Sequence, residues 1–170
     1  MGLFDFLTGT KRAPKGTPVA PAADVEAALM AVNRETAPFQ VARDDSGKAD
    51  LVAEWKIVDA TWYEIFAKAG LERVFRIYMK LDPAAKEVRA VDEEYSVEWR
   101  SGLPSLSLAA SGFKGQKKEV SFGTAVGFTE ELKPGVVYNY KFATGEIKTP
   151  LQQAVTANGW TWKGVAFGKL

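Results

Sequence analysis

The alternation of apolar and polar side chains between Phe75 and Leu81 constrains the fold of this chain more than any other feature. One parity is apolar and the other is polar: Phe75, Ile77, Met79 and Leu81 against Arg76, Tyr78 and Lys80. Successive side chains of a strand point to opposite faces of a sheet, so the pattern predicts a strand with one buried face. Residues 82–86 contain Asp and Pro and predict a turn, after which a return strand is expected from Glu87 to Arg100.

The return strand carries apolar residues of both parities. One set is Val91, Tyr95, Val97 and Trp99, and the other is Val88 and Ala90. A strand with a period of two cannot bury both sets on one face. We therefore expect a β-bulge between Arg89 and Asp92, which would shift the parity within the strand.

The rest of the chain predicts further strands and three short helices. The first helix is expected to be capped by Asp24 and stopped by Pro38, and the last to be capped by Thr149 with Pro150 in its first turn. The remaining helix is expected over 59–70, and the remaining strands over 39–43, 51–57, 106–113, 119–128, 136–142 and 160–167, with a turn over 114–118. This order predicts the α+β class: a curved, mainly antiparallel sheet of about seven or eight strands covered by the helices.

Residues 1–23 differ in composition from the single domain expected over 24–170. The tail begins with an apolar peptide and continues over 8–23 with Pro, Gly, Ala and Thr, a composition that favours an extended linker. The apolar peptide contains Leu3, Phe4, Phe6 and Leu7, and the cations that follow it are Lys11, Arg12 and Lys15. This arrangement is typical of an interfacial membrane anchor or a partner-docking peptide. The alternative is that the tail folds back on its own domain or is disordered.

The chain contains neither cysteine nor histidine, and this removes many kinds of site. Disulfides, thiolate nucleophiles, histidine-based triads and the usual zinc ligands are excluded. The acidic run 92–94 lies on a predicted strand, where neighbouring side chains diverge, so it is interpreted as a solvated acidic stretch rather than a metal site. No glycine-rich phosphate motif occurs. We therefore expect no catalytic residues, no metal and no cofactor.

Charge and hydropathy constrain the partners and the compartment. The net charge of +1 argues against a general nucleic-acid binder, which usually carries a basic excess. No apolar run reaches the roughly 18 residues of a transmembrane helix, and the first residues lack the pattern of a secretory signal. We expect a cytoplasmic protein without a transmembrane segment, for which peripheral membrane contact stays open.

The candidate binding site lies on the predicted sheet. Strands over 106–112 and 123–127 are rich in small residues and could line a concave surface. Its aromatic wall would be formed by Trp55, Trp99, Tyr138, Tyr140 and Trp162. Glu93 shares the parity of Val97 and would be the polar anchor, with Arg76 or Lys56 as its cationic partner. The plainer interpretation is that the aromatic rings are core and that a helix packs on the small residues.

These observations favour a non-catalytic binding module. It would hold a small apolar or amphipathic ligand, or a protein partner, against the curved sheet. The first alternative is an adaptor tethered to a membrane surface or a partner through residues 1–7. The second is an enzyme that uses carboxylate, Lys or Tyr chemistry without His or Cys.

Overall fold

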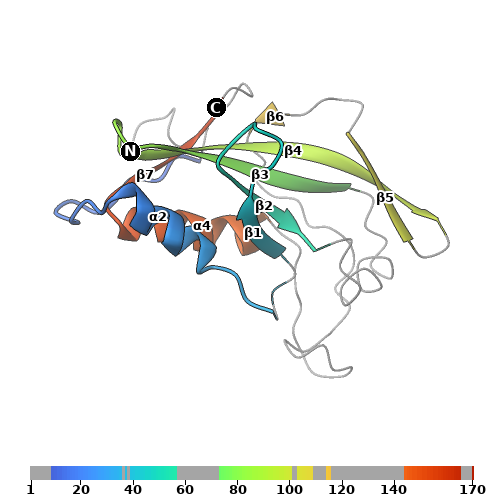
Figure 1. Cartoon of the computed structure of the whole chain (residues 1–170), viewed down its shortest axis with the longest axis horizontal. Coiled ribbons are helices and arrows are strands. Elements are labelled where there is room, and N and C mark those ends of the chain that lie inside the picture. Colours follow the sequence, from blue (N-terminus) through green and yellow to red (C-terminus); the bar gives the residue numbers. More distant parts are fainter. Residues whose placement is uncertain are drawn as a thin grey trace.

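One mixed β-sheet carries two helices on one of its faces (Figure 1). The computed structural model describes residues 9–35, 37, 39–56, 73–100, 103–108, 114–115, 144–165 and 170. Its strands are β1 Phe39–Arg43, β2 Leu51–Trp55, β3 Arg73–Asp82, β4 Glu87–Arg100, β5 Leu103–Leu108, β6 Lys114–Gly115 and β7 Thr161–Gly164, and its helices are α2 Ala22–Met30 and α4 Thr144–Ala157.

The α+β class is confirmed, but the expected numbers of strands and helices are not matched. The path of neighbouring strands runs through five members, from β1 to β5, and β6 and β7 join it only through β4. The described residues hold two helices. The helix expected over 59–70 and the strands expected over 119–128 and 136–142 lie outside the described residues. None of the described helices is both long enough and apolar enough to cross a membrane.

Strand β4 organises the sheet because both of its edges are paired along almost its whole length. Strand β3 pairs antiparallel with residues 87–96 of β4. The opposite edge of β4 is lined in succession by β7 at residues 87–90, β6 at 92–93 and β5 at 95–100. The pairing with β7 is parallel, which makes the sheet mixed. Lys114 and Gly115, expected in a turn, instead form the short strand β6.

The β-bulge expected near Arg89 is wrong. The register between β3 and β4 is continuous, from Arg73 opposite Ser96 to Asp82 opposite Glu87. Both parities of β4 can be buried because both faces of the sheet are covered. Val88 and Ala90 belong to the main core under the helices, whereas Val91 packs with Val52 and Tyr78 on the other face.

The main core lies between the sheet and the two helices. Trp55 contacts Phe39 and Phe75 edge to face, with ring centroids 6.1 and 6.0 Å apart. The largest fully buried side chains are Trp160, Trp162, Phe75, Leu29, Leu51, Ile77, Met79, Ile147, Leu151 and Val25. The core therefore joins α2 and α4 with β1, β2, β3, β4 and β7 into one packed unit.

Both helix starts differ from expectation. Helix α2 begins at Ala22, with Pro21 at the N-cap position, so Asp24 lies in the first turn, where a carboxylate still favours the helix dipole. Helix α4 begins at Thr144, so Thr149 is not its cap and Pro150 lies inside the helix. Ile147, Leu151 and Val155 are buried on one stripe of α4, and this stripe extends upstream of the proline.

The described part of the tail, residues 9–21, lies against the domain. The backbone of Lys11 exchanges two hydrogen bonds with Trp162, each 2.8 Å long. The Gly164 N–H donates to Thr10 Oγ1 at 3.2 Å, and the indole N–H of Trp160 donates to the Ala20 carbonyl at 2.8 Å. The tail thus folds back on its own domain over these residues, while residues 1–8 lie outside the described part. A domain boundary near Asp24 stays a prediction.

Candidate functional site

The structure separates Glu93 from Trp55 and Trp162, three of the residues of the predicted binding site. Trp55 and Trp162 are buried in the main core, and Trp99 is half-buried against it. Glu93 is opposite Arg76 in the register, whereas the core residue Ile77 is opposite Asp92. Glu93 therefore points to the other face of the sheet, away from α2 and α4, which we call the outer face. Tyr138 and Tyr140 lie outside the described residues.

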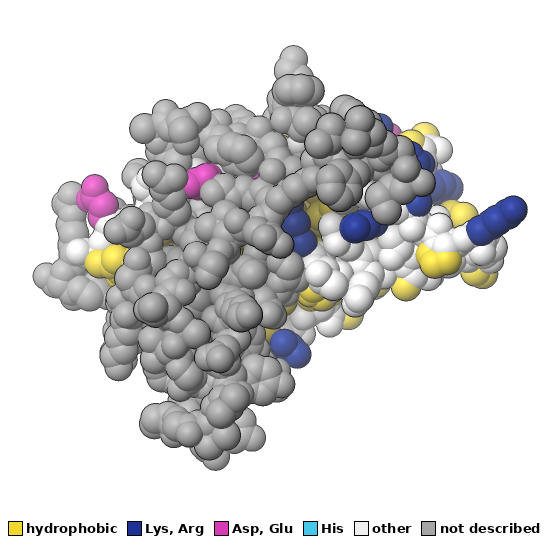
Figure 2. Space-filling model, turned by 180° about the vertical axis from the view of Figure 1, so that it is seen from behind, with side chains coloured by type: hydrophobic (Ala, Val, Ile, Leu, Met, Phe, Trp, Pro, Cys, Tyr) yellow, Lys and Arg dark blue, Asp and Glu magenta, His cyan; other side chains and the backbone are white. Residues whose placement is uncertain are grey.

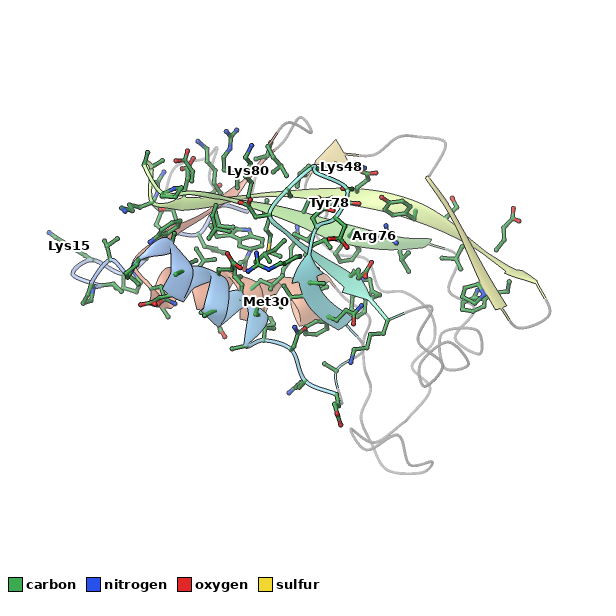
Figure 3. All side chains as sticks on the ribbon, viewed as in Figure 1. Lys15, Met30, Lys48, Arg76, Tyr78 and Lys80 are labelled. Carbon is green, nitrogen blue, oxygen red and sulfur yellow. The ribbon has the colours of Figure 1, made fainter. Side chains whose placement is uncertain are left out.

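The outer face carries three rows of side chains, each made of residues that are paired across neighbouring strands. Lys48 and Lys80 lie on this side of the sheet, away from the helices (Figure 3). The basic row is Lys80, Arg89 and Lys163; the apolar row is Val52, Tyr78 and Val91; and the charged row is Gln40, Glu54, Arg76 and Glu93. The charged row ends at the register position of Lys114 in β6.

The charged row alternates in sign across the sheet. Arg76 Nε lies 3.0 Å from Glu54 Oε2, and Gln40 Nε2 donates to Glu54 Oε1 at 3.3 Å. The Arg76 guanidinium also stacks over the Tyr95 ring, 4.6 Å from its centroid. Arg76, expected beside Glu93, therefore pairs with Glu54. Lys56, the other expected partner, donates to the backbone carbonyls of residues 34 and 35.

Glu93 is nearly buried, and its cationic partner comes from the loop between β1 and β2. Its side chain is 6% exposed, and its two carboxylate oxygens lie 3.3 and 3.4 Å from Lys48 Nζ. The Tyr95 hydroxyl donates to Glu93 Oε1 at 2.9 Å, and the Tyr78 hydroxyl lies 3.0 Å from that of Tyr95. Burial first, and then the hydrogen bonds with Tyr78 and Glu93, raise the pKa of Tyr95. Tyr95 is thus a neutral donor rather than a base.

The acidic run 92–94 is buried, so its interpretation as a solvated stretch is wrong. Asp92 and Glu94 face the main core, where Asp92 is fully buried and its Oδ2 lies 2.5 Å from Lys148 Nζ of α4. Glu93 faces the opposite side of the sheet. Among the described residues, no group of acidic side chains converges in a way that could hold a metal ion.

The basic row lies beside the point where the tail leaves the described structure. Lys80 and Lys163 are exposed and Arg89 is half-buried. Lys163 Nζ is 3.7 Å from Glu87, a loose contact. The hydrogen bond from Gly164 to Thr10 fixes the tail next to Lys163. The linker and the β3–β4 turn contribute further exposed cations: Lys11, Arg12, Lys15 and Lys86. Dark-blue side chains accordingly gather towards the right of Figure 2.

Sequence reasoning missed the basic row. The turn at 82–86 fixes the β3–β4 register, so the pairing of Lys80 with Arg89 could have been read from the hairpin. The addition of Lys163 could not, since it depends on a parallel pairing between distant segments. No protein-family model, curated protein or solved structure matches this chain. Its function must therefore be argued from the geometry of the site.

Proposed function

We propose that this chain is a non-catalytic adaptor that docks on an anionic membrane surface through its basic row and its apolar N-terminal peptide. One observation carries the proposal: the backbone pairing of Lys11 with Trp162 and the bond between Thr10 and Gly164. These contacts hold Thr10 and Lys11 beside Lys163, and Leu7 precedes Thr10 by three residues in the sequence. The apolar peptide with Leu3, Phe4, Phe6 and Leu7 is therefore connected to the domain next to the basic row.

Neither the apolar peptide nor the basic row suffices alone for stable docking. A short apolar segment gives marginal and reversible membrane binding, and stable anchoring needs a second signal. Each Lys or Arg close to an anionic bilayer contributes about 1 kcal/mol, so the basic row adds about 3 kcal/mol. That corresponds to a factor of roughly 100 in the partition coefficient. Because the linker is fixed to β7, both elements can engage one surface at the same time.

Ligand binding on the outer face of the sheet is the second candidate function. The nearly buried Glu93, with Tyr78, Tyr95 and Lys48 around it, supports this proposal. Trp55 and Trp162 do not share that face, so these two rings of the expected aromatic wall do not contribute to it. Enzymatic chemistry is less well supported, because the raised pKa of Tyr95 keeps its phenol protonated.

Vesicle flotation tests membrane docking. The full chain is mixed with vesicles of phosphatidylcholine alone or with added phosphatidylserine. We expect flotation only with phosphatidylserine, because the basic row recognises negative charge. A full-length variant that carries Ser at the four apolar positions keeps the length and charge of the tail and should lose most of this binding: Leu3→Ser, Phe4→Ser, Phe6→Ser and Leu7→Ser. A wild-type chain that stays unbound, or a Ser variant that floats equally well, contradicts the proposal.

A further inference from the structure

We propose that Glu93 and Tyr78 form a binding site for a primary alkylammonium group, and that Lys48 occupies this site as an internal ligand. The site lies on the outer face of the sheet, where β3 and β4 pair. It is separate from the basic row, and the inference does not depend on membrane docking.

The site has the two groups that recognise an ammonium ion. Glu93 supplies a carboxylate whose side chain is 6% exposed, so its charge is poorly screened by water. The Tyr78 ring supplies an aromatic face, with its centroid 5.1 Å from Lys48 Nζ. A cation within about 6 Å of a ring centroid is attracted by the negative face of the ring. The N–H groups of a primary ammonium can donate to the carboxylate, which a quaternary ammonium cannot do.

Tyr95 holds the Glu93 carboxylate in place, but the neighbouring Arg76 does not neutralise its charge. The Tyr95 hydroxyl donates to Glu93 Oε1 at 2.9 Å, and Tyr95 is held in turn by the Tyr78 hydroxyl. Arg76 is directed to Glu54 and stacks on the Tyr95 ring. The neighbouring guanidinium is therefore engaged elsewhere, and among the side chains that the structure describes it is Lys48, from the loop, that supplies the ammonium beside Glu93.

Lys48 is a loosely held occupant. Its side chain is 49% exposed, and its distances of 3.3 and 3.4 Å from the Glu93 oxygens exceed those of a strong charge-assisted bond, about 2.8 Å. A flexible lysine also loses rotamer freedom when it is held in one position. An external ammonium could therefore replace Lys48 without breaking a strong contact.

The loop that carries Lys48 keeps its shape independently of the lysine side chain. Asp44 Oδ1 accepts hydrogen bonds from the Ser46 N–H and hydroxyl, and Asp44 Oδ2 accepts one from the Ala49 N–H at 2.9 Å. Although burial opposes it, these bonds hold the pKa of Asp44 below its ordinary value. Ala49 packs against the apolar row. Removing the Lys48 side chain should therefore vacate the site without unfolding the loop.

The test is ligand rescue of the vacated site, measured on the full chain by thermal unfolding. The probe is n-butylammonium chloride, compared with sodium chloride at equal ionic strength. If Lys48 occupies the site about nine-tenths of the time, its removal should lower the apparent dissociation constant of the probe about tenfold. We therefore expect Lys48→Ala to be stabilised at about tenfold lower n-butylammonium concentrations than the wild type.

Two controls separate this site from general charge effects. Lys15→Ala removes another exposed lysine, from the linker, and should respond to n-butylammonium like the wild type. Adding Glu93→Gln to Lys48→Ala keeps an acceptor for Tyr95 but removes the charge, and should abolish the gain. If that double variant does not fold, tetramethylammonium serves instead: it has the same charge but no N–H group, and it should not stabilise Lys48→Ala.

The source of the ammonium is addressed by a second probe, a blocked Gly-Lys-Gly peptide. If both the peptide and n-butylammonium stabilise Lys48→Ala, the site accepts a lysine side chain of a partner protein. If only n-butylammonium does so, the ligand is a small amine. The proposal is overturned if Lys48→Ala and the wild type respond equally to both probes, or if sodium chloride gives the same stabilisation.

Discussion

The ion pair between Asp92 and Lys148 joins β4 to α4 inside the main core. Asp92 is fully buried, the Lys148 side chain is 10% exposed, and the two charged atoms are 2.5 Å apart. Lys148→Met keeps most of the length of the side chain but removes its charge. The Asp92 carboxylate then stays in the core without this counter-ion. We predict a large loss of stability from this one substitution.

The size of the loss follows from the burial of the pair. Removing one partner of a buried ion pair costs about 3–5 kcal/mol, because the other charge is left desolvated. At about 2–4 °C per kcal/mol for a chain of this size, the midpoint of thermal unfolding should fall by roughly 6–20 °C. Replacing both partners removes both charges. The double variant Asp92→Val, Lys148→Met should therefore lie within about 2 kcal/mol of the wild type.

A double-mutant cycle measured by urea unfolding checks this reasoning. The wild type, Asp92→Val, Lys148→Met and the double variant are compared at neutral pH. We expect an interaction energy of at least about 2 kcal/mol between the two positions. If Lys148→Met costs less than about 1 kcal/mol, or if the two single losses simply add, the pair does not hold α4 to the sheet as the structure indicates.

Three further predictions concern the sheet edge, the linker and pH. The Asn33 side-chain amide bonds both the N–H and the C=O of Val41, at 2.6 and 2.7 Å, on the edge of β1 that pairs with no other described strand. Asn33→Ala should cost about 1–2 kcal/mol and increase self-association in light scattering, and an unchanged scattering mass argues against this role. Gly159 has a φ of 76°, and a Cβ there would lie 2.4 Å from the Pro18 carbonyl oxygen. Gly159→Ala should therefore speed tryptic cleavage of the linker, and equal cleavage rates contradict linker docking. Because the pKa of Tyr95 is raised in the folded protein, its neutral phenol stabilises the fold up to pH 10, and this contribution is lost as the pH rises further. The free energy of unfolding of Tyr95→Phe, measured in urea, should therefore fall less above pH 10 than that of the wild type.

Local signals in the sequence predicted the hairpins well. The bounds of β1 and β4 are those expected, because alternation and turn chemistry act over a few neighbouring residues. The pairing of β7 with β4 was not predictable, because the pattern of a short strand does not identify the distant strand with which it pairs. The start of α4 was misplaced because Pro150 is a typical first-turn residue, although Ile147 already continues the buried stripe upstream of it.

The candidate site was predictable only in part. The parity of Glu93 indicated a buried acid, and the structure buries it, but on the face opposite to Trp55 and Trp162. When both faces of a strand carry apolar residues, their alternation does not show which face of the sheet the helices cover. The contact of Lys48 with Glu93 depends on the path of a loop over the sheet, for which the sequence holds no periodic signal.

The partition coefficient of charge variants on vesicles with phosphatidylserine tests the central claim most directly. The basic-row variant Lys80→Gln, Arg89→Gln, Lys163→Gln is compared with a variant that removes the same charge from residues in or near β1 and β2: Arg34→Gln, Arg43→Gln and Lys56→Gln. The account predicts a loss of roughly 100-fold for the basic-row variant and less than about threefold for the matched variant. Equal losses in the two variants, or no loss in the basic-row variant, would contradict docking through this end of the sheet.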